Sequence, residues 1–196
     1  MKTKNFKSLA VLLLALSLTT SIFAGSQKVD AAKSSVKWLA KKVGGEHSGT
    51  IAVKEGNLVV EKGKITGGKV VIDMNSIVDV DLTDAAWNAK LIGHLKSDDF
   101  FSVATFPTSD LVLTKVESNG ASSTFSGNLT IKGITNPISF TASSVKDGVN
   151  TTYKGVLTID RSKFNVRYGS KSFFDNLGDK VISDEFTLDF NLVVSE

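Results

Sequence analysis

The sequence contains no cysteine, and only two of its 196 residues are histidines. Without cysteine the chain has no disulfide framework, no thiol nucleophile and no thiolate metal site. We also expect no lipoprotein anchor, because that modification needs a cysteine. A histidine base, if the protein used one, would have to be His47 or His94.

Motifs that mark common enzyme classes are absent too. The sequence has no GxSxG elbow, P-loop, dinucleotide fingerprint or EF-hand. His47 lies in a glycine-rich stretch, GGEHSG, and is expected to be a solvated turn residue. His94 and Asp98 are four residues apart and would share a helix face, but two ligands are too few for a zinc site. We therefore expect no metal and no cofactor.

The first 24 residues have the layout of a secretory signal peptide: MKTKNFKSLAVLLLALSLTTSIFA. The apolar run from Leu9 to Leu18 is shorter than the ~20 residues that span a bilayer, which favours cleavage over a retained anchor. We expect cleavage after residue 24 or 26, and a single folded domain at 27–196. This indicates a periplasmic protein, with an extracellular location as the alternative.

The lysines of this segment change the interpretation of the charge. The whole sequence has 23 basic and 20 acidic residues. Removing Lys2, Lys4 and Lys7 leaves 20 of each sign, so the mature domain has no formal net charge. The sequence pI of 9.0 is therefore mostly a property of the segment to be removed, and we expect no nucleic-acid partner.

Beyond residue 30, apolar residues recur at every second position, which is the spacing of strands with one buried face. The clearest run is Phe125, Gly127, Leu129 and Ile131, and similar runs occur at 36–40, 70–74, 153–159 and 182–192. Glycine-rich breaks between the runs are typical of hairpin turns: Gly44-Gly45, Gly63, Gly67-Gly68, Asn119-Gly120, Gly133 to Pro137 and Asp147-Gly148. The pattern predicts an all-β fold, either a barrel or a sandwich of antiparallel strands.

One segment has helical spacing instead. Trp87, Leu91 and Leu95 are four residues apart, which predicts a short helix around 84–95 with three large apolar side chains along one stripe. The start of this helix could be capped by Asp81, Thr83 or Asp84.

The sequence has twelve phenylalanines. Of the ten beyond residue 24, three follow the predicted helix, three lie in a later loop-like region and four lie on predicted strands. The three after the helix are Phe100, Phe101 and Phe106. The three in the loop-like region are Phe164, Phe173 and Phe174, and the four on strands are Phe125, Phe140, Phe186 and Phe190. They could all be packed core, or some could form the wall of an apolar cavity.

Four segments carry a family resemblance, in the same order as in that family: GGKVVIDMNSI at 67–77, HLKSDDFF at 94–101 with Phe106-Pro107 after it, GNLTIKGITNPISF at 127–140 and IDRSKFNV at 159–166. Together they resemble the YceI-like family of bacterial periplasmic polyisoprenoid-binding proteins, over about Val29 to Val194. The family's Arg-Asp pair before the histidine is absent, since the chain has Leu91-Ile92-Gly93 there. Its Asp-Phe-Gly after IDR is replaced by Lys163-Phe164-Asn165.

The resemblance implies an eight-stranded antiparallel barrel, similar in shape to the lipocalins, with a short helix inserted around 84–95. An eight-stranded barrel is about the size that can hold one small ligand. We therefore interpret the domain as a non-enzymatic protein that binds, sequesters or transports an isoprenoid lipid of the polyprenyl quinone or polyprenyl phosphate type. Transient contact with a membrane surface and a homodimer are left open.

The candidates for the cavity wall are apolar residues on the inner faces of the strands and phenylalanines near the helix and the IDR segment: Trp38, Ile72, Met74, Phe100, Phe101, Phe106, Leu129, Ile131, Leu157, Ile159, Phe164, Phe186 and Leu188. Phe100 and Phe101 are expected to pack the helix against the barrel or to line its mouth. In an extended segment these two neighbours would point to opposite sides. Asp98 and Asp99 are expected to face water or to cap a turn.

Two alternatives remain open. The protein could be a hydrolase or isomerase acting on a lipid-like substrate, with His94 and either Asp98 or Asp99 as base and acid. It could also be an envelope interaction protein whose barrel is filled by its own side chains. An enzyme would lose turnover in a His94→Ala variant, whereas a filled barrel would yield no lipid on extraction.

Overall fold

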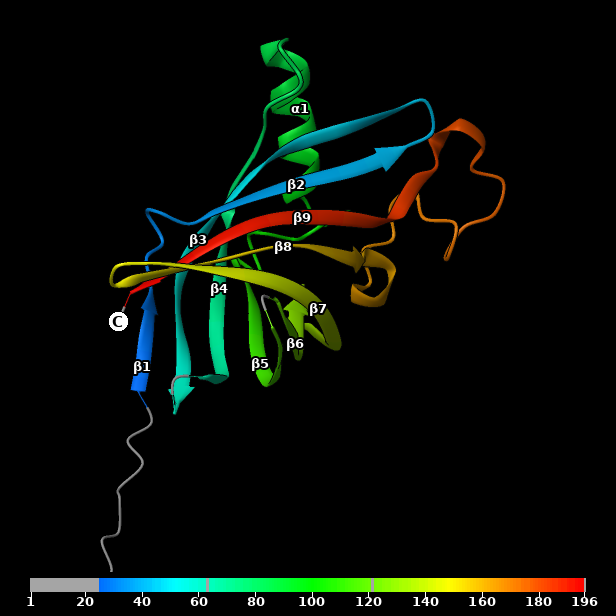
Figure 1. The fold of residues 1–196 in the computed structure, drawn as a ribbon. Helices are drawn as coiled ribbons and strands as arrows, with labels where there is room; N and C mark the ends of the chain where they lie inside the picture. The colour runs from blue at the N-terminus through cyan, green and yellow to red at the C-terminus, as the bar shows by residue number, and fades with distance from the viewer. Residues whose placement is uncertain (1–24, 63, 121, 196) are drawn as a thin grey trace, which may run out of the picture.

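The computed structural model describes residues 25–62, 64–120 and 122–195. The expected signal peptide at 1–24 lies outside these residues. The described chain forms nine strands, one α-helix and two 3-10 helices (Figure 1). None of the helices within it has both the length and the apolar character needed to cross a membrane.

The strands are β1 (Gly25–Val29), β2 (Ser35–Lys42), β3 (Gly45–Glu61), β4 (Lys64–Asp79), β5 (Thr108–Asn119), β6 (Ser122–Ile131), β7 (Ile134–Asp147), β8 (Asn150–Asp160) and β9 (Ile182–Ser195). Between β4 and β5 lies the helix α1 (Ala85–Lys96), and between β8 and β9 lie the 3-10 helices η1 (Arg161–Phe164) and η2 (Gly178–Lys180).

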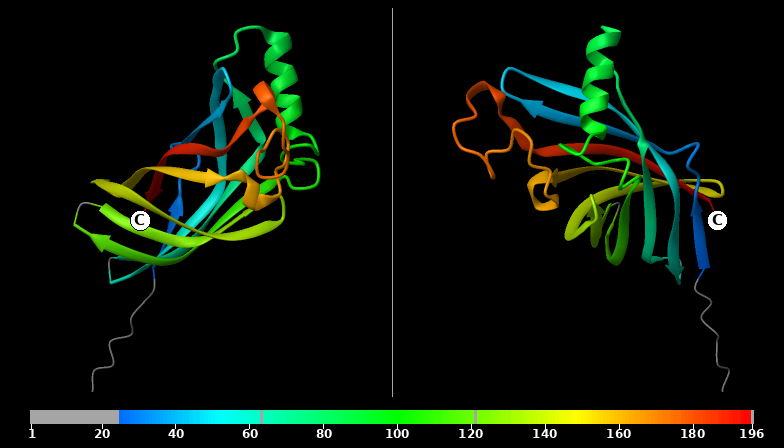
Figure 2. Two further views of the ribbon diagram at one scale, coloured as in Figure 1. Left: turned by 90° about the vertical axis from the view of Figure 1, so that its right-hand side faces the viewer. Right: turned by 180° about the vertical axis from the view of Figure 1, so that it is seen from behind.

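The strands close into a barrel with eight positions. Antiparallel neighbours follow the order β3-β2-β9-β8-β7-β6-β5-β4, and β4 pairs with β3 to complete the ring. β1 pairs with β3 and β9, as β2 does, so β1 and β2 occupy one position in succession. Figure 2 shows the strands curving into this ring from two further sides. The predicted eight-stranded antiparallel barrel with one short helix is confirmed.

Alternation of side chains decides which face of each strand is buried. On β6 the residues Phe125, Gly127, Leu129 and Ile131 are buried, as predicted, and those between them are more exposed. Alternation does not reveal β3 and β5, because register shifts interrupt their ladders. A bulge that adds one residue to a strand, as between Val53 and Glu55 of β3 and between Leu113 and Lys115 of β5, inverts the faces that follow it.

The predicted turn at Gly67-Gly68 is wrong, because both residues lie inside β4, paired with Val59 and Leu58 of β3. Gly68 has a φ of +150°, and a Cβ there would lie 2.9 Å from the Cα of Leu58. The glycines therefore serve a close approach of two strands and not a reversal of the chain. At Gly133 to Pro137 the turn is confined to its start, since β7 begins at Ile134.

The helix α1 matches the predicted range and is capped by Asp84, whose carboxylate accepts hydrogen bonds from the backbone N–H groups of Ala86 and Trp87. Only part of the predicted stripe is buried, however. Leu95 is buried and Leu91 half-buried, but Trp87 is 60% exposed. The reason is that the first turns of α1 project beyond the end of the barrel (Figure 1).

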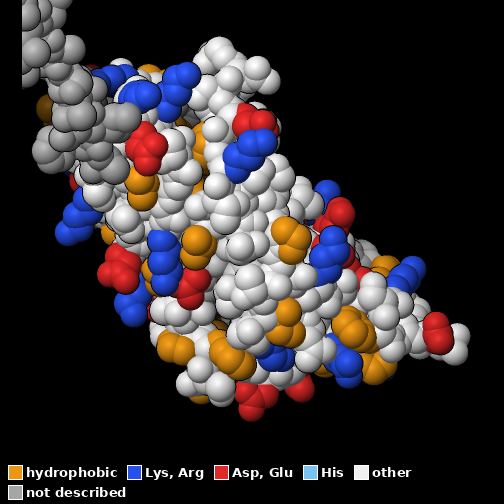
Figure 3. Space-filling model, turned by 90° about the horizontal axis from the view of Figure 1, so that it is seen from below, with side chains coloured by type: hydrophobic (Ala, Val, Ile, Leu, Met, Phe, Trp, Pro, Cys, Tyr) orange, Lys and Arg blue, Asp and Glu red, His pale blue; other side chains and the backbone are white. Residues whose placement is uncertain are grey.

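The face seen from below carries charges of both signs (Figure 3). Lysine and arginine side chains alternate there with aspartate and glutamate, and apolar side chains form small separate spots. This face therefore offers no extended surface of one sign for a polyanion.

Trp38 packs against Gly49 where β2, β3 and β4 meet. The two residues are opposite each other in the β2–β3 register, and the indole Nε1 donates to the backbone carbonyl of Val78 on β4, at 3.1 Å. A Cβ on Gly49 would collide with that same carbonyl oxygen and lie 2.6 Å from the Trp38 ring. The missing side chain at Gly49 is therefore what lets the indole bridge two strands.

We expect Gly49→Ala to lower the free energy of unfolding by ~1–3 kcal/mol, the usual cost of forcing an extra carbon into a packed site. Gly93→Ala is the control, because a Cβ at Gly93 on α1 meets nothing within 4 Å and should stabilise the helix by about 1 kcal/mol. Urea unfolding monitored by tryptophan fluorescence measures both. Equal stability of Gly49→Ala and the wild type would show that Trp38 is not held as described.

Candidate functional site

The barrel interior contains two adjoining cavities. The distal cavity, of about 100 Å³, is lined by Val36, Val53, Leu58, Val70, Ile72, Ser109, Leu111, Leu113, Phe125, Leu129, Phe140, Ala142, Tyr153, Leu157, Leu188, Phe190 and Leu192. The helix cavity, of about 110 Å³, is lined by Trp38, Ala40, Ile51, Ile72, Met74, Ile77, Leu95, Phe100, Phe101, Ser109, Leu129, Ile131, Ile159, Arg161, Ile182, Ser183, Phe186 and Leu188. The two cavities share a wall, which is formed by Ile72, Ser109, Leu129 and Leu188.

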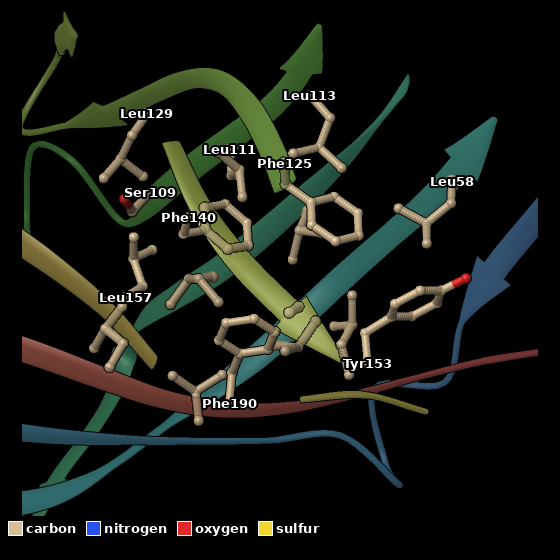
Figure 4. Close-up of a pocket in the computed structure, with 17 residues that line it drawn as sticks. Leu58, Ser109, Leu111, Leu113, Phe125, Leu129, Phe140, Tyr153, Leu157 and Phe190 are labelled. Carbon is tan, nitrogen blue, oxygen red and sulfur yellow. The ribbon is translucent and has the colours of Figure 1, made fainter. Parts of the chain in front are cut away.

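Four aromatic rings form one side of the distal cavity (Figure 4). Phe125 stacks on Phe140 with ring centres 5.5 Å apart, and Phe140 meets Phe190 edge to face at 5.7 Å. Tyr153 approaches Phe125 at 5.9 Å, and its hydroxyl points away from the neighbouring rings. Burial raises the pKa of Tyr153, so its hydroxyl stays neutral. The rings support one another and form a rigid apolar wall.

The helix cavity receives both Phe100 and Phe101. The chain turns after α1, with the backbone N–H of Phe101 bonded to the carbonyl of Leu95 at 3.2 Å. This turn directs both rings inward, whereas an extended segment would have separated them. Their centres lie 5.1 Å apart, and Phe101 also approaches Phe186 at 6.4 Å. Asp98 is exposed, which places its carboxylate outside the cavity.

The polar side chains in the shared wall and the helix cavity have their own partners. Ser109 donates from Oγ to the carbonyl of Thr130 at 2.7 Å. Arg161, only 2% exposed, donates to the carbonyls of Ser183, Val166 and Ile182 at 2.8–3.0 Å. Since these groups are satisfied by the backbone, the cavities present mainly hydrocarbon to an occupant.

Arg161 also pairs with Asp184, because its Nη2 lies 3.4 Å from Oδ1 of that carboxylate. Burial opposes ionisation of Asp184, but the hydroxyls of Ser170 and Ser172 and the charge of Arg161 outweigh it and hold the pKa below its usual value. Burial likewise lowers the pKa of the Arg161 guanidinium, against the charges of Asp184 and Asp160. The pair joins η1 to the start of β9.

The structure places eleven of the thirteen predicted wall residues at a cavity. Ile72, Leu129 and Leu188 line both cavities, and Leu157 lines the distal one. The helix cavity contains the other seven: Trp38, Met74, Phe100, Phe101, Ile131, Ile159 and Phe186. Contact of these residues with a ligand stays a prediction.

Phe106 and Phe164 lie elsewhere. Phe106 covers Gly133 in the turn between β6 and β7, where an added Cβ would lie 2.7 Å from its ring. Phe164 is buried in η1 as part of the packed core. Neither residue lines the two cavities described above.

Sequence reasoning missed most of the distal cavity and the buried guanidinium of Arg161. The signal for the rings was available, because Phe125 and Tyr153 stand four residues before the candidates Leu129 and Leu157 on their strands, and so face the same way. The signal for Arg161 was weaker, since a charged residue after a strand is usually exposed.

The two histidines lie in different surroundings. His94 packs against Tyr168, with ring centres 4.3 Å apart, and against Phe100 at 5.7 Å. The expectation that His47 lies in a turn is wrong, because it belongs to β3 and its Nδ1 lies 2.9 Å from Oδ2 of Asp81.

A charged cluster forms where β4 ends. His47, Asp79 and Asp81 bring their ligand-type atoms within 4.8 Å of one another. Burial, together with the neighbouring carboxylate of Asp81, raises the pKa of Asp79. Burial acts in the same direction on Asp81, but hydrogen bonds from Ser48 and His47 lower its pKa overall. These three side chains are the group in the described residues that could hold a metal ion.

Comparisons with known proteins give one consistent relationship. A family model described as the YceI-like domain matches residues 27–194. A UPF0312 protein of Pseudomonas aeruginosa strain LESB58 is 31% identical over 105 residues, which cover 50% of this chain and 51% of that protein. Protein YceI of Salmonella arizonae is 28% identical over 103 residues, or 53% and 48% of the two chains. The chain spans about half the length of the curated relatives it matches.

Two solved structures share the fold. BcnA of Burkholderia cenocepacia is 28% identical with a TM-score of 0.64, over 84% of this chain and 98% of that one. A polyisoprenoid binding domain from Saccharophagus degradans, implicated in plant cell wall breakdown, is 15% identical with a TM-score of 0.62, over 86% and 97%. At that identity the second likeness concerns the fold alone.

The depressed pKa of Asp184 predicts acid sensitivity. Its ion pair and hydrogen bonds stabilise the fold above the pKa of the unfolded carboxyl, and this contribution is lost as the pH falls through the lower folded value. Asp184→Asn should therefore cost roughly 1.5–3 kcal/mol at pH 7 and less at acid pH. Urea unfolding from pH 7 to pH 2 measures the difference, with the exposed Asp175→Asn as control. A constant deficit at every pH would contradict the assignment.

Proposed function

The chain belongs to the YceI-like family, and we propose that its barrel binds the hydrocarbon chain of an isoprenoid lipid. The protein then acts as a binding, sequestering or transport protein and performs no covalent chemistry. The observation that carries the proposal is the pair of adjoining apolar cavities, in which Ser109 and Arg161 are already bonded to backbone carbonyls.

The walls suit a branched hydrocarbon better than a polar substrate. A polar ligand would leave its own groups without partners there, at a cost of several kcal/mol. A prenyl tail gains about 0.8 kcal/mol for each methylene removed from water. Transfer of the tail from water into a membrane yields the same free energy per methylene. The barrel can therefore hold the tail outside a bilayer.

Apolar cavities of this size favour an occupant. Unfilled apolar volume costs roughly 24 cal/mol per Å³, or about 2 kcal/mol for each cavity of this size. A ligand that fills them restores these contacts and stabilises the fold. The same observation disfavours an interaction protein with a filled barrel, which would have no such cavities.

The likeness to the Saccharophagus polyisoprenoid binding domain supports the ligand class, although that likeness is in fold. The head group in this proposal is a quinone or a phosphate. We propose that it lies at the helix-cavity end of the lumen, away from the aromatic and aliphatic side chains that surround Ser109 in the distal cavity.

We further propose that the protein is exported and works in the periplasm, on the basis of the segment at 1–24. Lipid exchange then needs contact with a membrane. Exposed apolar side chains suited to such contact lie on α1 and the β8–β9 connection, which share one end of the molecule (Figure 1): Trp87, Tyr168 and Phe174, which are 48–60% exposed. A homodimer stays a prediction.

An enzyme based on His94 finds less support. His94 packs among aromatic rings, and Asp98 and Asp99 are exposed. A base and an acid should lie within hydrogen-bond reach of a common reacting atom in the cavity. Because the side chains of these two aspartates are exposed to solvent, they lie away from the apolar interior.

Native mass spectrometry of protein purified from its own envelope tests the proposal directly. We expect one isoprenoid adduct per chain, identified after extraction with organic solvent. A bare mass, together with no uptake of an offered C45 polyprenol or long-chain prenyl quinone, would reject lipid binding.

A matched pair of tryptophan substitutions tests the site. Leu157 faces the distal cavity and its neighbour Val156 is 58% exposed on the same strand. Leu157→Trp should fill the lumen and weaken polyprenol binding at least ~10-fold, since lost burial of two methylenes already has that effect. Val156→Trp should bind like the wild type. Equal affinity of both variants, with circular dichroism showing intact folds, would place the ligand elsewhere.

Export predicts a defined mature end. Protein recovered from the periplasm by osmotic shock should begin at Gly25 or Gln27 when sequenced from its N-terminus. Recovery in the cytoplasmic fraction with Met1 retained would reject the location.

A further inference from the structure

We propose that His47, Asp79 and Asp81 form a binding site for a divalent transition-metal ion, best matched by zinc, at the seam where β3 and β4 close the barrel. The three side chains offer one imidazole and two carboxylates, with ligand-type atoms within 4.8 Å of one another. This site is separate from the lipid cavities and does not depend on their occupant.

The backbone brings these residues together from distant parts of the sequence. Gly49 and Asp79 are paired in the β3–β4 ladder, and the next loop turns back so that Val80 N donates to the carbonyl of Ser48 at 2.9 Å. Asp81 then lies beside β3, where its Oδ1 accepts from Ser48 N at 2.6 Å. The position of each ligand is therefore fixed by strand pairing.

A second observation, at Asp79, also points to a cation ligand. Asp79 is only 7% exposed, and its Oδ2 is buried without a hydrogen-bond partner. Its other oxygen, Oδ1, is fully engaged, since it accepts from the N–H of Leu82 at 2.9 Å and from the amide of Asn88 at 3.1 Å. A buried carboxylate oxygen that faces a second carboxylate needs a cation or a proton beside it.

The ligand set selects the class of ion. Calcium and magnesium prefer oxygen ligands only, in larger numbers, whereas imidazole favours zinc and its neighbours in the periodic table. Zinc is bound at about 2.0–2.2 Å, which puts tetrahedral ligand atoms roughly 3.4 Å apart. The ligand atoms lie within 4.8 Å of one another, so zinc binding requires side-chain rotations that bring them closer together. The side chains of His47 and Asp81 are 23% and 34% exposed, which gives an ion a path from solvent.

An ion bound here would stabilise the end of the barrel at which α1 lies. Asn88 on α1 donates to both the carboxylate and the carbonyl of Asp79. An ion held by Asp79 therefore ties β3 and β4 to α1, whose last turn supplies Leu95 to the helix cavity.

Isothermal titration of zinc into the chelator-treated mature protein tests the site. We expect one zinc ion per chain with micromolar or tighter affinity and a rise in the melting temperature. His47→Gln and Asp81→Asn should each weaken binding at least ~10-fold, and both residues are exposed enough for the fold to tolerate the change. Cobalt substitution should give the visible absorption of a four-coordinate site and lose it in His47→Gln.

His94→Gln is the matched control, because the sequence has only these two histidines. It should bind zinc like the wild type. Loss of zinc binding in His94→Gln with retention in His47→Gln would overturn the proposal. So would the absence of zinc binding to the wild type at micromolar concentrations, which would mean that a proton lies between the two carboxyl groups.

Discussion

The pairing of β4 with β3 is the contact on which the rest of the structure depends. It closes the ring, so every strand gains a neighbour on each side and the inner face becomes a continuous apolar surface. The ladder bends at three register shifts, and glycines allow its strands to approach closely. Bulges and glycines of this kind supply the curvature that a closed barrel needs. At Gly49 the same approach lets Trp38 bridge β2 and β4.

Closure at eight positions leaves more room than the inward side chains fill. The result is two adjoining cavities rather than a packed centre. Their polar lining groups are held by the backbone, as in Arg161 with its three carbonyl partners. A buried charge whose donors are bonded to the backbone makes no demand on an occupant, so the apolar surface stays open to a lipid tail.

The two ends of the barrel differ in what covers them. At one end α1 and the segment before β9 lie on the same side, and His94 meets Tyr168 between them. Phe100 and Phe101 enter the cavity below this contact. The cluster of His47, Asp79 and Asp81 lies at the same end, so metal binding, helix position and lipid access would involve neighbouring groups. Proximity alone does not couple these groups. Asn88 of α1 does connect the helix to the cluster, through its hydrogen bonds to Asp79.

Local chemistry was sufficient for several features of this protein. Alternation in β6 predicts its buried face, the cap candidates Asp81, Thr83 and Asp84 indicate where α1 begins, and the order of four motifs indicates the family. The first two depend on residues within a few positions of one another, and the third depends on the order of segments along the chain, so the sequence displays all three directly.

Only the tertiary structure decided the features that depend on register and on distant segments. A bulge in β3 obscures its alternation. A turn after α1 directs Phe100 and Phe101 to one side, and Trp87 is exposed because the first turns of the helix extend beyond the barrel. His47 and Asp79 meet across a β ladder that no local pattern specifies. The number of strands that close the ring sets the interior volume. That volume decides which apolar residues fill the core and which surround a cavity.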